Sequence, residues 1–319
     1  MFVNRTLTIG GIGALVLGGA GLILALGNQG ALRKVSTEFE NEIAALSRTT
    51  KGLNEEIRMM GSAVGFVIEF ENGTTLYLSG DSGISSEMEI INDIYNPYAA
   101  FLAIGGVYTM GQEEAAYAAQ LVNPQKFVVP YHYKSFPFIG SDDSIFVERI
   151  KAAKAQGRMT ADPLVFTEDE EKEIGGVKVR WLAHAAFLFT SPEGKKILLD
   201  PSESVPTLPE KYKQDWKNLG GLDLVLITHG HFDHAHVPTL RKLSEAFPQA
   251  VILTSFELAN YLTPLIGIPV IAANPDSAFT KKIFKQSAGI DVNMGSIKVH
   301  LVPANHSSSV FGSEGIVPF

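Results

Sequence analysis

The sequence contains no cysteine, so disulfide bonds, thiolate metal sites and cysteine nucleophiles are excluded, while the cellular compartment stays open. Any metal ion must therefore be held by histidine and carboxylate side chains. Positive charge is also scarce, because 26 Lys and Arg stand against 34 Asp and Glu and give a net charge of −8. Nucleic-acid binding requires a cationic surface, so this balance and the lack of a Lys/Arg-rich stretch argue against a nucleic-acid partner and against a nuclease.

Sequence repeats of fixed period are absent, and the composition excludes a disordered or collagen-like chain. Hydrophobic residues make up 45% of the 319 residues and charged residues 19%, with 30 Gly and 16 Pro. At ~150 residues per domain, this length allows one large domain or two small ones, each able to bury a substantial core.

Charged residues are missing from residues 7–27. At ~1.5 Å per residue, this apolar run is long enough to cross a hydrocarbon core of ~30 Å, which predicts a transmembrane anchor within residues 1–30 and a single-pass membrane protein. A cleaved signal peptide is the alternative, since a short tail ending in Arg5 precedes the run. Arg5 lies on one side of it and Arg33 and Lys34 on the other, so the positive-inside rule does not decide the orientation.

Residues 31–60 are predicted to form an amphipathic helical stalk, which either pairs as a short coiled coil or packs on its own domain. Apolar side chains recur there near helical spacing: Leu32, Val35, Phe39, Ile43, Leu46, Leu53 and Ile57. Small residues spaced by four in the apolar run, Gly10, Ala14 and Gly18, permit close helix pairing in lipid. Anchor and stalk together therefore offer a route to a homo-oligomer.

From residue 61 onward, short apolar runs predict strands that alternate with helices. The runs at 65–70 and 75–78 flank Asn72-Gly73 and predict a β-hairpin. Further strands are expected at 100–104, 127–129, 177–181, 186–190, 196–199, 222–228, 251–253 and 297–302, and helices at 113–121, 144–155, 237–246 and 256–262. Residues 156–176 are polar, contain Pro163 and an acidic run, and are expected to be a connector. The alternation predicts the α/β class, with sheets covered by helices.

A cluster of metal-ligand residue types follows the apolar strand expected at 222–228. His229, His231, Asp233 and His234 form the sequence His-Gly-His-Phe-Asp-His, although the whole chain contains only 8 histidines. A buried strand that ends in such a cluster presents several ligands from one tight loop on a rigid scaffold. Imidazole and carboxylate are ligands that suit zinc, iron and manganese. The loop therefore predicts a metal site.

Four further candidate residues each follow a predicted strand. Asp81 lies after 75–78, His132 after 127–129, His184 after 177–181 and His306 after 297–302. Each of these residues alone is more typical of a structural role than of a ligand. Their shared position behind strands, together with the histidine loop, favours one common site.

The loop His-x-His-x-Asp-His resembles the signature of the metallo-β-lactamase superfamily, a sandwich of two β-sheets flanked by helices with a dinuclear metal site at one edge. Within it, the chain is similar to the L-ascorbate-6-phosphate lactonase-like and N-acyl-phosphatidylethanolamine phospholipase D-like branch. The segments that carry this similarity are Trp-Leu-Ala-His-Ala at 181–185, Ile-Leu-Leu-Asp-Pro at 197–201, Asn-His-Ser at 305–307, Gly-Asp-Ser-Gly at 80–83 and Pro-Tyr-His-Tyr at 130–133. The resemblance implies a four-layer αββα fold over residues 61–319.

The order of these segments differs from that of the family, in which the elements found here at 80–83 and 130–133 close the domain. Here they precede the rest, so we interpret the chain as a circular permutant. Residues 61–155 would correspond to the C-terminal half of the usual fold and residues 177–319 to its N-terminal half. The connector 156–176 would join the two usual termini, which often lie close together in space. A mis-assembled gene model is the alternative.

Carried over position by position, the resemblance implies a ligand set for two metal ions. His229, His231 and His306 would hold the first ion, and Asp233, His234 and His132 the second, with Asp81 bridging both. Two divalent ions, zinc with manganese or iron as alternatives, would share a hydroxide.

The remaining residues of the implied site receive other roles. Asp233 would also orient the hydroxide and pass its proton to the leaving group. His184 is expected to stabilise an oxyanion or bind substrate, and Asp200 to orient a ligand imidazole. His236 and His300 are expected to be structural, and His300 to face solvent because it alternates with the apolar residues of its strand.

This pattern predicts a membrane-anchored, metal-dependent hydrolase that opens an ester or lactone or cleaves a phosphodiester. Its substrate would be a small or lipid-like molecule. An amphiphilic substrate is favoured, because a membrane tether beside the cleft raises the effective concentration of bilayer-resident molecules there. The alternative of another class is a metal-binding membrane protein without turnover, acting as a sensor or assembly factor.

Overall fold

The computed structural model describes residues 57–140, 142–273, 295 and 297–311. The predicted membrane anchor at 1–30 and all but the last residues of the predicted stalk lie outside these ranges. Within the described ranges, every helix is too short or too polar to cross a membrane.

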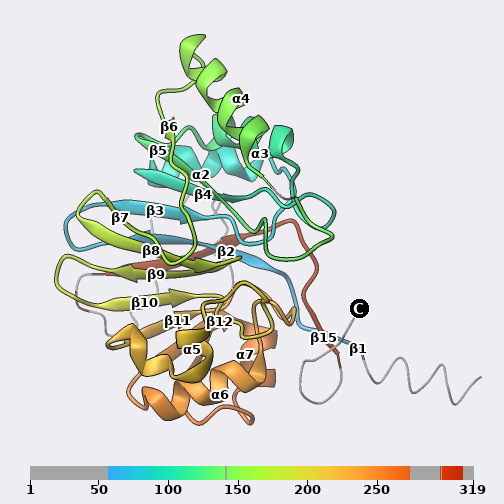
Figure 1. The fold of residues 1–319 in the computed structure, drawn as a ribbon, viewed down its shortest axis with the longest axis vertical. Helices are drawn as coiled ribbons and strands as arrows, with labels where there is room; N and C mark the ends of the chain where they lie inside the picture. Colours follow the sequence, from blue (N-terminus) through green and yellow to red (C-terminus); the bar gives the residue numbers. More distant parts are fainter. Residues whose placement is uncertain (1–56, 141, 274–294, 296, 312–319) are drawn as a thin grey trace, which may run out of the picture. The chain divides into compact units, whose positions relative to one another are not determined.

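Two β-sheets form the centre of the fold (Figure 1). The first sheet has the strand order β14-β2-β3-β4-β5-β6, with β2 at Val64–Glu69, β3 at Thr75–Leu78, β4 at Ala99–Ala103, β5 at Phe127–Tyr131, β6 at Asp162–Pro163 and β14 at Lys298–Pro303. The second has the order β13-β12-β11-β10-β9-β8-β7, with β7 at Glu171–Ile174, β8 at Val177–Ala183, β9 at Ala186–Thr190, β10 at Lys196–Leu199, β11 at Leu224–Leu226, β12 at Val251–Ser255 and β13 at Val270–Ala273.

Helices cover the outer face of each sheet (Figure 1). Helices α2 (Glu87–Tyr95), α3 (Gln112–Val122) and α4 (Ser144–Ala155) lie on the first sheet, and α5 (Glu210–Gln214), the 3₁₀ helix η1 (Trp216–Leu219), α6 (Val237–Ala246) and α7 (Phe256–Leu262) lie on the second. Strand β11 shows why the layers form: Leu224 and Leu226 join the core between the sheets, while Val225 joins the core under α6 and α7. Strands buried on both faces read as continuous apolar runs, which is the pattern of this segment.

The sequence located most elements correctly, and two expectations were wrong. Residues Ile57–Met59, expected to end the helical stalk, form strand β1, which pairs antiparallel with β15 at Ser309–Phe311. This pairing satisfies backbone groups that a frayed helix end would leave open, so the tertiary contact outweighs the helical periodicity. The connector 156–176 contains β6 and β7, and each of these strands forms the edge of one sheet. The alternating charges of β7, Glu171-Lys172-Glu173, suit an edge strand.

Strand direction explains why the candidate residues meet. In the first sheet, β3, β4 and β5 run parallel, and β14 runs with them because β14 and β3 are both antiparallel to β2. In the second sheet, β10 and β11 run parallel, and β8 shares their direction because β9 is antiparallel to both β8 and β10. The loops that follow β3, β5 and β14 therefore leave one edge of the first sheet, and those that follow β8, β10 and β11 leave one edge of the second.

Gly80 precedes one of the site carboxylates and permits the close approach of three strand ends. Its φ is +60°, and a Cβ there would lie 2.6 Å from the backbone oxygen of Val64 and 3.3 Å from the Thr228 side chain. Any other residue would combine left-handed strain with a backbone clash.

We expect Gly80→Ala to lower the free energy of unfolding by ~1–3 kcal/mol more than Gly73→Ala, because overpacking adds to the left-handed strain that both variants share. Gly73 is the matched control, since its φ is +83° and a Cβ there would meet no atom within 4 Å. Urea unfolding of both variants measures the difference. Equal losses would contradict the constraint at Gly80.

Candidate metal centre

Three histidine rings from two sheets meet where the strands end. His229 and His231 lie in the loop after β11, and His306 follows β14. His229 Nε2 is 3.0 Å from His231 Nδ1, and His306 Nε2 is 3.2 Å from the same atom. Around a tetrahedral ion with metal–nitrogen distances of ~2.0–2.1 Å, neighbouring ligand atoms lie about 3.3 Å apart. These three residues, the first cluster, are therefore spaced as ligands of one ion.

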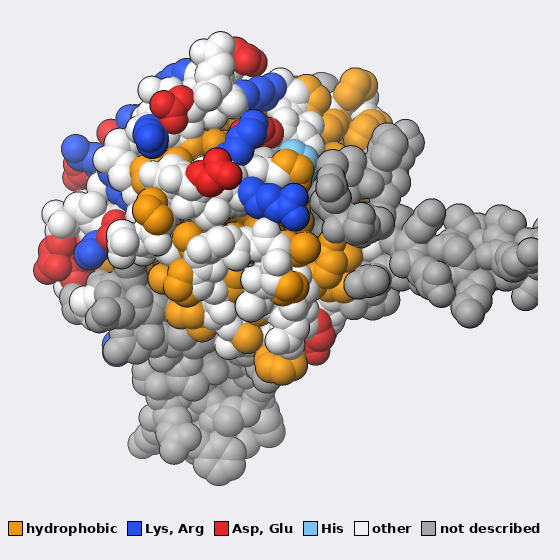
Figure 2. All heavy atoms as spheres, turned by 90° about the horizontal axis from the view of Figure 1, so that it is seen from below, with side chains coloured by type: hydrophobic (Ala, Val, Ile, Leu, Met, Phe, Trp, Pro, Cys, Tyr) orange, Lys and Arg blue, Asp and Glu red, His pale blue; other side chains and the backbone are white. Residues whose placement is uncertain are grey.

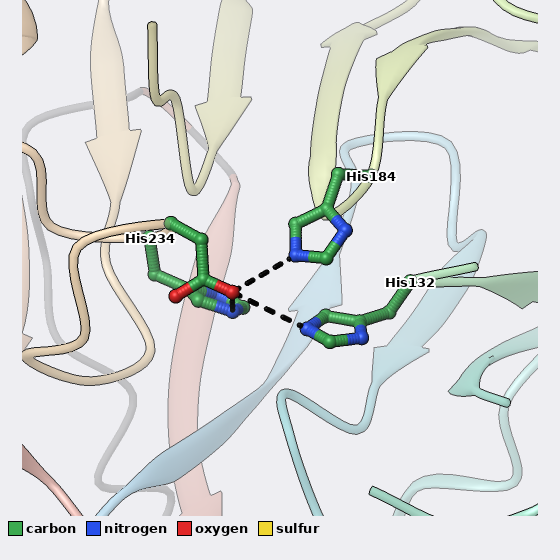
Figure 3. Close-up of side chains that lie close together, drawn as sticks. His132, His184 and His234 are labelled. Atoms are coloured by element: carbon green, nitrogen blue, oxygen red, sulfur yellow. Dashed lines mark hydrogen bonds and ion pairs between the residues drawn. The ribbon is translucent and has the colours of Figure 1, made fainter. Parts of the chain in front are cut away.

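A second cluster consists of His132, Asp233 and His234. Asp233 Oδ2 is 3.7 Å from His132 Nε2 and 3.6 Å from His234 Nε2. Figure 3 shows the rings of His132 and His234 pointing toward the same carboxylate from opposite parts of the fold. His132 is contributed by the loop after β5 of the first sheet, whereas the other two residues come from the loop after β11 of the second.

Asp81 lies between the two clusters. Its Oδ2 is 3.0 Å from His132 Nε2 and 3.3 Å from His234 Nε2 of the second cluster. The same oxygen is 3.9 Å from His229 Nε2 and 4.0 Å from His306 Nε2 of the first. The structure therefore brings all seven predicted ligands together, with Asp81 in the position between two groups of three.

The donor set fits metal ions. Asp81, His132 and His234 are buried, and among the described residues the second oxygen of Asp81, Oδ1, has no hydrogen-bond partner, while the two Nε2 atoms face only carboxylate oxygens. A buried polar atom without a partner costs ~1–3 kcal/mol, so such atoms are rare unless something else satisfies them. Carboxylate oxygens and imidazole nitrogens that converge in this way are the donors that divalent ions bind.

The electrostatics of the centre also favour cations. Burial alone would lower the pKa of His132, but the carboxylates of Asp81 and Asp233 raise it to about 9. The pKa of His234 is raised well above its usual range against the same burial effect. The pKa of His231, by contrast, falls to about 4, mainly because the ring is buried. The second cluster is therefore a place of negative potential, in which bound cations would replace protons.

Asp200 and Thr228 fix the orientation of two rings. Asp200 Oδ2 is 2.9 Å from His234 Nδ1 and also accepts a hydrogen bond from Thr228 Oγ1 at 2.7 Å. Thr228 Oγ1 in turn lies 2.9 Å from His229 Nδ1. Because each Nδ1 is engaged in this way, each Nε2 is left free to face the centre. The contact predicted for Asp200 is present, and Thr228, which the sequence analysis did not select, completes it.

His184 lies against the second cluster. Its Nε2 is 3.0 Å from Asp233 Oδ2, its Nδ1 is 2.8 Å from Ser135 Oγ, and its ring centroid is 3.8 Å from that of His132 (Figure 3). Burial, followed by the charge of His132, lowers the pKa of His184 to about 4, so the ring is neutral at pH 7. A neutral His184 therefore donates Nε2–H to Asp233. The ring is also within reach of the atoms of the second cluster as a further ligand.

Three of the eight described non-glycine residues with positive φ lie at this centre. His132, His184 and Asp200 are non-glycine residues in the left-handed region, with φ values of 59°, 53° and 40°. Such conformations cost roughly 1–3 kcal/mol each and persist where the surrounding structure enforces them, which is common at functional sites.

The two remaining histidines lie outside the centre, as predicted. His236 Nδ1 is 2.7 Å from Thr239 Oγ1 at the start of α6. His300 was expected to face solvent, and this was wrong: its ring is buried, its Nε2 is 2.7 Å from Glu69 Oε1, and it packs on Tyr95. The alternation of β14 does place His300 on the opposite face from its apolar neighbours, but helix α2 covers that face.

A cavity of about 460 Å³ opens beside the two clusters. Asp81, His132, His184, His231, Asp233 and His306 line one side, and the other walls are largely apolar, with Phe136, Phe138, Phe232, Tyr108, Ile139 and Val310 among their residues. Sequence reasoning missed these aromatic residues and Ser135. Their only signal is that Ser135, Phe136 and Phe232 lie within four residues of a predicted ligand.

Comparison with known proteins gives a partial match. Residues 178–314 match the family model described as a beta-lactamase superfamily domain. A UPF0173 metal-dependent hydrolase of Methanosphaera stadtmanae is 42% identical over 120 residues, which cover 37% of this chain and 50% of that protein. A second, from Pyrobaculum islandicum, is 47% identical over 92 residues, covering 29% of this chain and 40% of that protein.

The solved structure of Igni18, a novel metallo hydrolase from Ignicoccus hospitalis, is 39% identical over 30% of this chain and 40% of that chain, with a TM-score of 0.27. The chain thus spans about half or less of the length of these relatives. The matched segment supplies His184, Asp200, the His229–His234 loop and His306. Residues 178–314 are therefore similar in sequence to a beta-lactamase superfamily domain and to curated metal-dependent hydrolases.

Proposed function

We propose that the chain is a metal-dependent hydrolase whose two metal ions share the buried carboxylate of Asp81. One observation carries the proposal: seven buried or half-buried ligand atoms from four loops form two groups of three around one carboxylate oxygen. The names of the curated relatives support the same activity. Zinc is favoured because imidazole nitrogens dominate the donor set, while manganese and iron suit the same residues.

Bound at this centre, two divalent ions would lower the pKa of a water molecule toward ~7 and polarise the bond to be cleaved. The residues of the chain supply the rest of the chemistry. Asp233 Oδ2 accepts a hydrogen bond from His184 Nε2 at 3.0 Å, which holds the carboxylate in place. Asp233 can then take a proton from the attacking water and give it to the leaving oxygen. Since His184 Nε2–H already binds Asp233, a positioning role for His184 is favoured over a purely oxyanion-binding one.

Ester, lactone and phosphodiester hydrolysis all fit such a centre. The proposed membrane span at residues 7–27 would favour amphiphilic substrates and a homo-oligomer through anchor and stalk. The cavity of about 460 Å³ beside the ligands gives a substrate room next to the proposed metal ions, which supports the hydrolase over a purely structural metal site.

We further propose that the chain is a circular permutant within the lactonase-like and phospholipase D-like branch. The segment that matches the family, 178–314, lacks Asp81 and His132, and residues 61–155 provide both. Together the two segments hold all seven proposed ligands. The short passage between β6 and β7 would then be the joint between the usual termini.

Peptide mapping tests the permuted order in protein isolated from its natural source. We expect mass spectrometry to find peptides that run from α4 through residues 156–176 into β8. Peptides that place His132 C-terminal to His306 would show a mis-assembled gene instead.

Removal of one ligand is expected to damage both metal positions. In Asp81→Ala we expect bound metal to fall to about one equivalent or less and hydrolysis to be lost, because this carboxylate serves both clusters. His231→Ala is expected to act in the same direction. Elemental analysis and an assay with model esters and phosphodiesters measure the two effects.

His236→Ala is the matched control for these variants, because it removes a half-buried histidine whose ring contacts Thr239 outside the centre. It should retain native metal content and rate. Two bound metals and a near-native rate in Asp81→Ala would refute the shared site.

His184→Ala is expected to keep its metals and to lose ~10²-fold in rate, the size of effect seen when one catalytic hydrogen bond is removed. His184→Gln should recover part of the rate, because its amide N–H can reach Asp233, whereas a merely structural role would not predict this rescue. Metal analysis and the rate are measured for both variants. Loss of metal in His184→Ala would instead make His184 a ligand.

A further inference from the structure

A continuous row of aromatic rings leads from the metal centre to the surface. The ring centroid of Phe136 is 5.3 Å from that of His184 and 5.3 Å from that of Phe138, with which it is stacked. Phe138 in turn meets Tyr108 at 6.1 Å. Phe232, which lies in the histidine loop, also packs beside Phe136, with 6.2 Å between their ring centroids. All four aromatic residues line the cavity.

The outer end of this row is exposed. Phe138 is 46% exposed and Tyr108 is 48% exposed, and Val107 beside them is 75% exposed. Large apolar side chains grouped at the mouth of a cavity are typical of a binding site for apolar groups. Figure 2 shows hydrophobic side chains (orange) next to histidine (pale blue) near one edge of the molecule.

The two loops that carry the exposed residues are tied together. Gly140 N donates to Gly105 O at 2.8 Å, and Lys134 N donates to Gly140 O at 2.7 Å. Val107 adopts φ 44°, which is unfavourable for a β-branched residue. The backbone therefore holds the apolar rim in place before any ligand binds, which lowers the entropic cost of binding.

Charge is confined to one side of the cavity. None of the described residues that line it is Lys or Arg, and all its acidic residues and histidines belong to the metal centre or touch it. Lys134, in the loop that carries Phe136 and Phe138, lies 3.7 Å from Asp143 and does not line the cavity. The described cavity walls therefore contain no Lys or Arg that could bind a phosphate or carboxylate group lying away from the proposed metal ions.

We propose that this cavity binds the apolar acyl group of a neutral ester or lactone, a proposal that rests on the hydrolase function above. The carbonyl would lie at the metal centre and the hydrocarbon group along Phe136, Phe138 and Tyr108. Water adds to the carbonyl carbon, the bond to the alcohol oxygen breaks, and the products are a carboxylic acid and an alcohol. A lactone opens to the hydroxy acid by the same step.

A series of p-nitrophenyl esters from butyrate to octanoate tests the proposal with the full chain loaded with zinc. We expect kcat/KM to rise about fourfold for each added methylene, because each buried methylene contributes ~0.8 kcal/mol. Bis(p-nitrophenyl) phosphate is the charged comparison and should be the poorer substrate. Methyl ketones of the same chain lengths, which cannot be hydrolysed, should bind more tightly with length in calorimetry of both the metal-free and the zinc-loaded protein.

Phe138→Ala should lower the octanoate-to-butyrate ratio of kcat/KM about tenfold and weaken binding of the long ketone, since it removes an aromatic wall. Phe256→Ala is the matched control: Phe256 is 49% exposed, begins α7 and does not line the cavity, so the ratio should stay as in the unaltered protein.

The outcomes separate the two proposals. Turnover with no dependence on chain length, or an equal change of the ratio in both phenylalanine variants, would overturn the apolar acyl site and leave the hydrolase function standing. Faster cleavage of the phosphodiester than of every ester would also overturn it. No turnover of any substrate by the zinc-loaded protein would overturn the hydrolase function itself, and the ester assignment with it.

Discussion

The buried carboxylate of Asp81 is the feature on which the geometry of the centre depends. Its Oδ2 lies within 4.0 Å of four histidine nitrogens, and these come from the loops after β5, β11 and β14. An ionised carboxylate without water must have positive partners close by, since burial without them is costly. The two sheets must therefore bring together the edges at which these strands end. The shared direction of β3, β5 and β14 in the first sheet and of β8, β10 and β11 in the second makes this possible.

Hydrogen bonds from neighbouring side chains hold the candidate ligands in the required orientation. Asp200 serves His234 and, through Thr228, His229, while Ser135 and Asp233 hold His184 from both ring nitrogens. Asp200 and His184 adopt left-handed backbone conformations that the surrounding strands must stabilise. The strain and the hydrogen bonds occur at the same residues, so part of the folding free energy is used to pre-organise the centre.

The sequence revealed the parts of this protein that are encoded locally. The helices at Ser144–Ala155, Val237–Ala246 and Phe256–Leu262 and the strands at Ala186–Thr190 and Lys196–Leu199 have the predicted bounds, because periodicity and turn residues specify them. Strands β1 and β6 could not be found in this way, since each consists of two or three residues and exists only through its partner strand. The burial of His300 depends likewise on helix α2, which is distant in sequence.

The candidate ligands could be selected because a metal restricts the residue types that hold it, and this chain has few histidines and no cysteine. No such restriction applies to a wall of the cavity, where Leu, Phe or Ile would all be plausible, so the residue types of Phe136 and Phe138 carried no signal. Their position nevertheless follows from that of a ligand. His132 begins the loop that follows β5, and the same loop continues to Phe136 and Phe138.

A change in that loop would therefore move a metal ligand and the substrate wall together. The histidine loop has the same property, because it carries Phe232 between His231 and Asp233. Each sheet thus contributes at least one candidate ligand and an aromatic wall residue from a single loop. In the proposed complex, these two loops would position part of the metal centre and part of the apolar wall together, so the backbone of each loop would help to set the distance between the reacting bond and the apolar group.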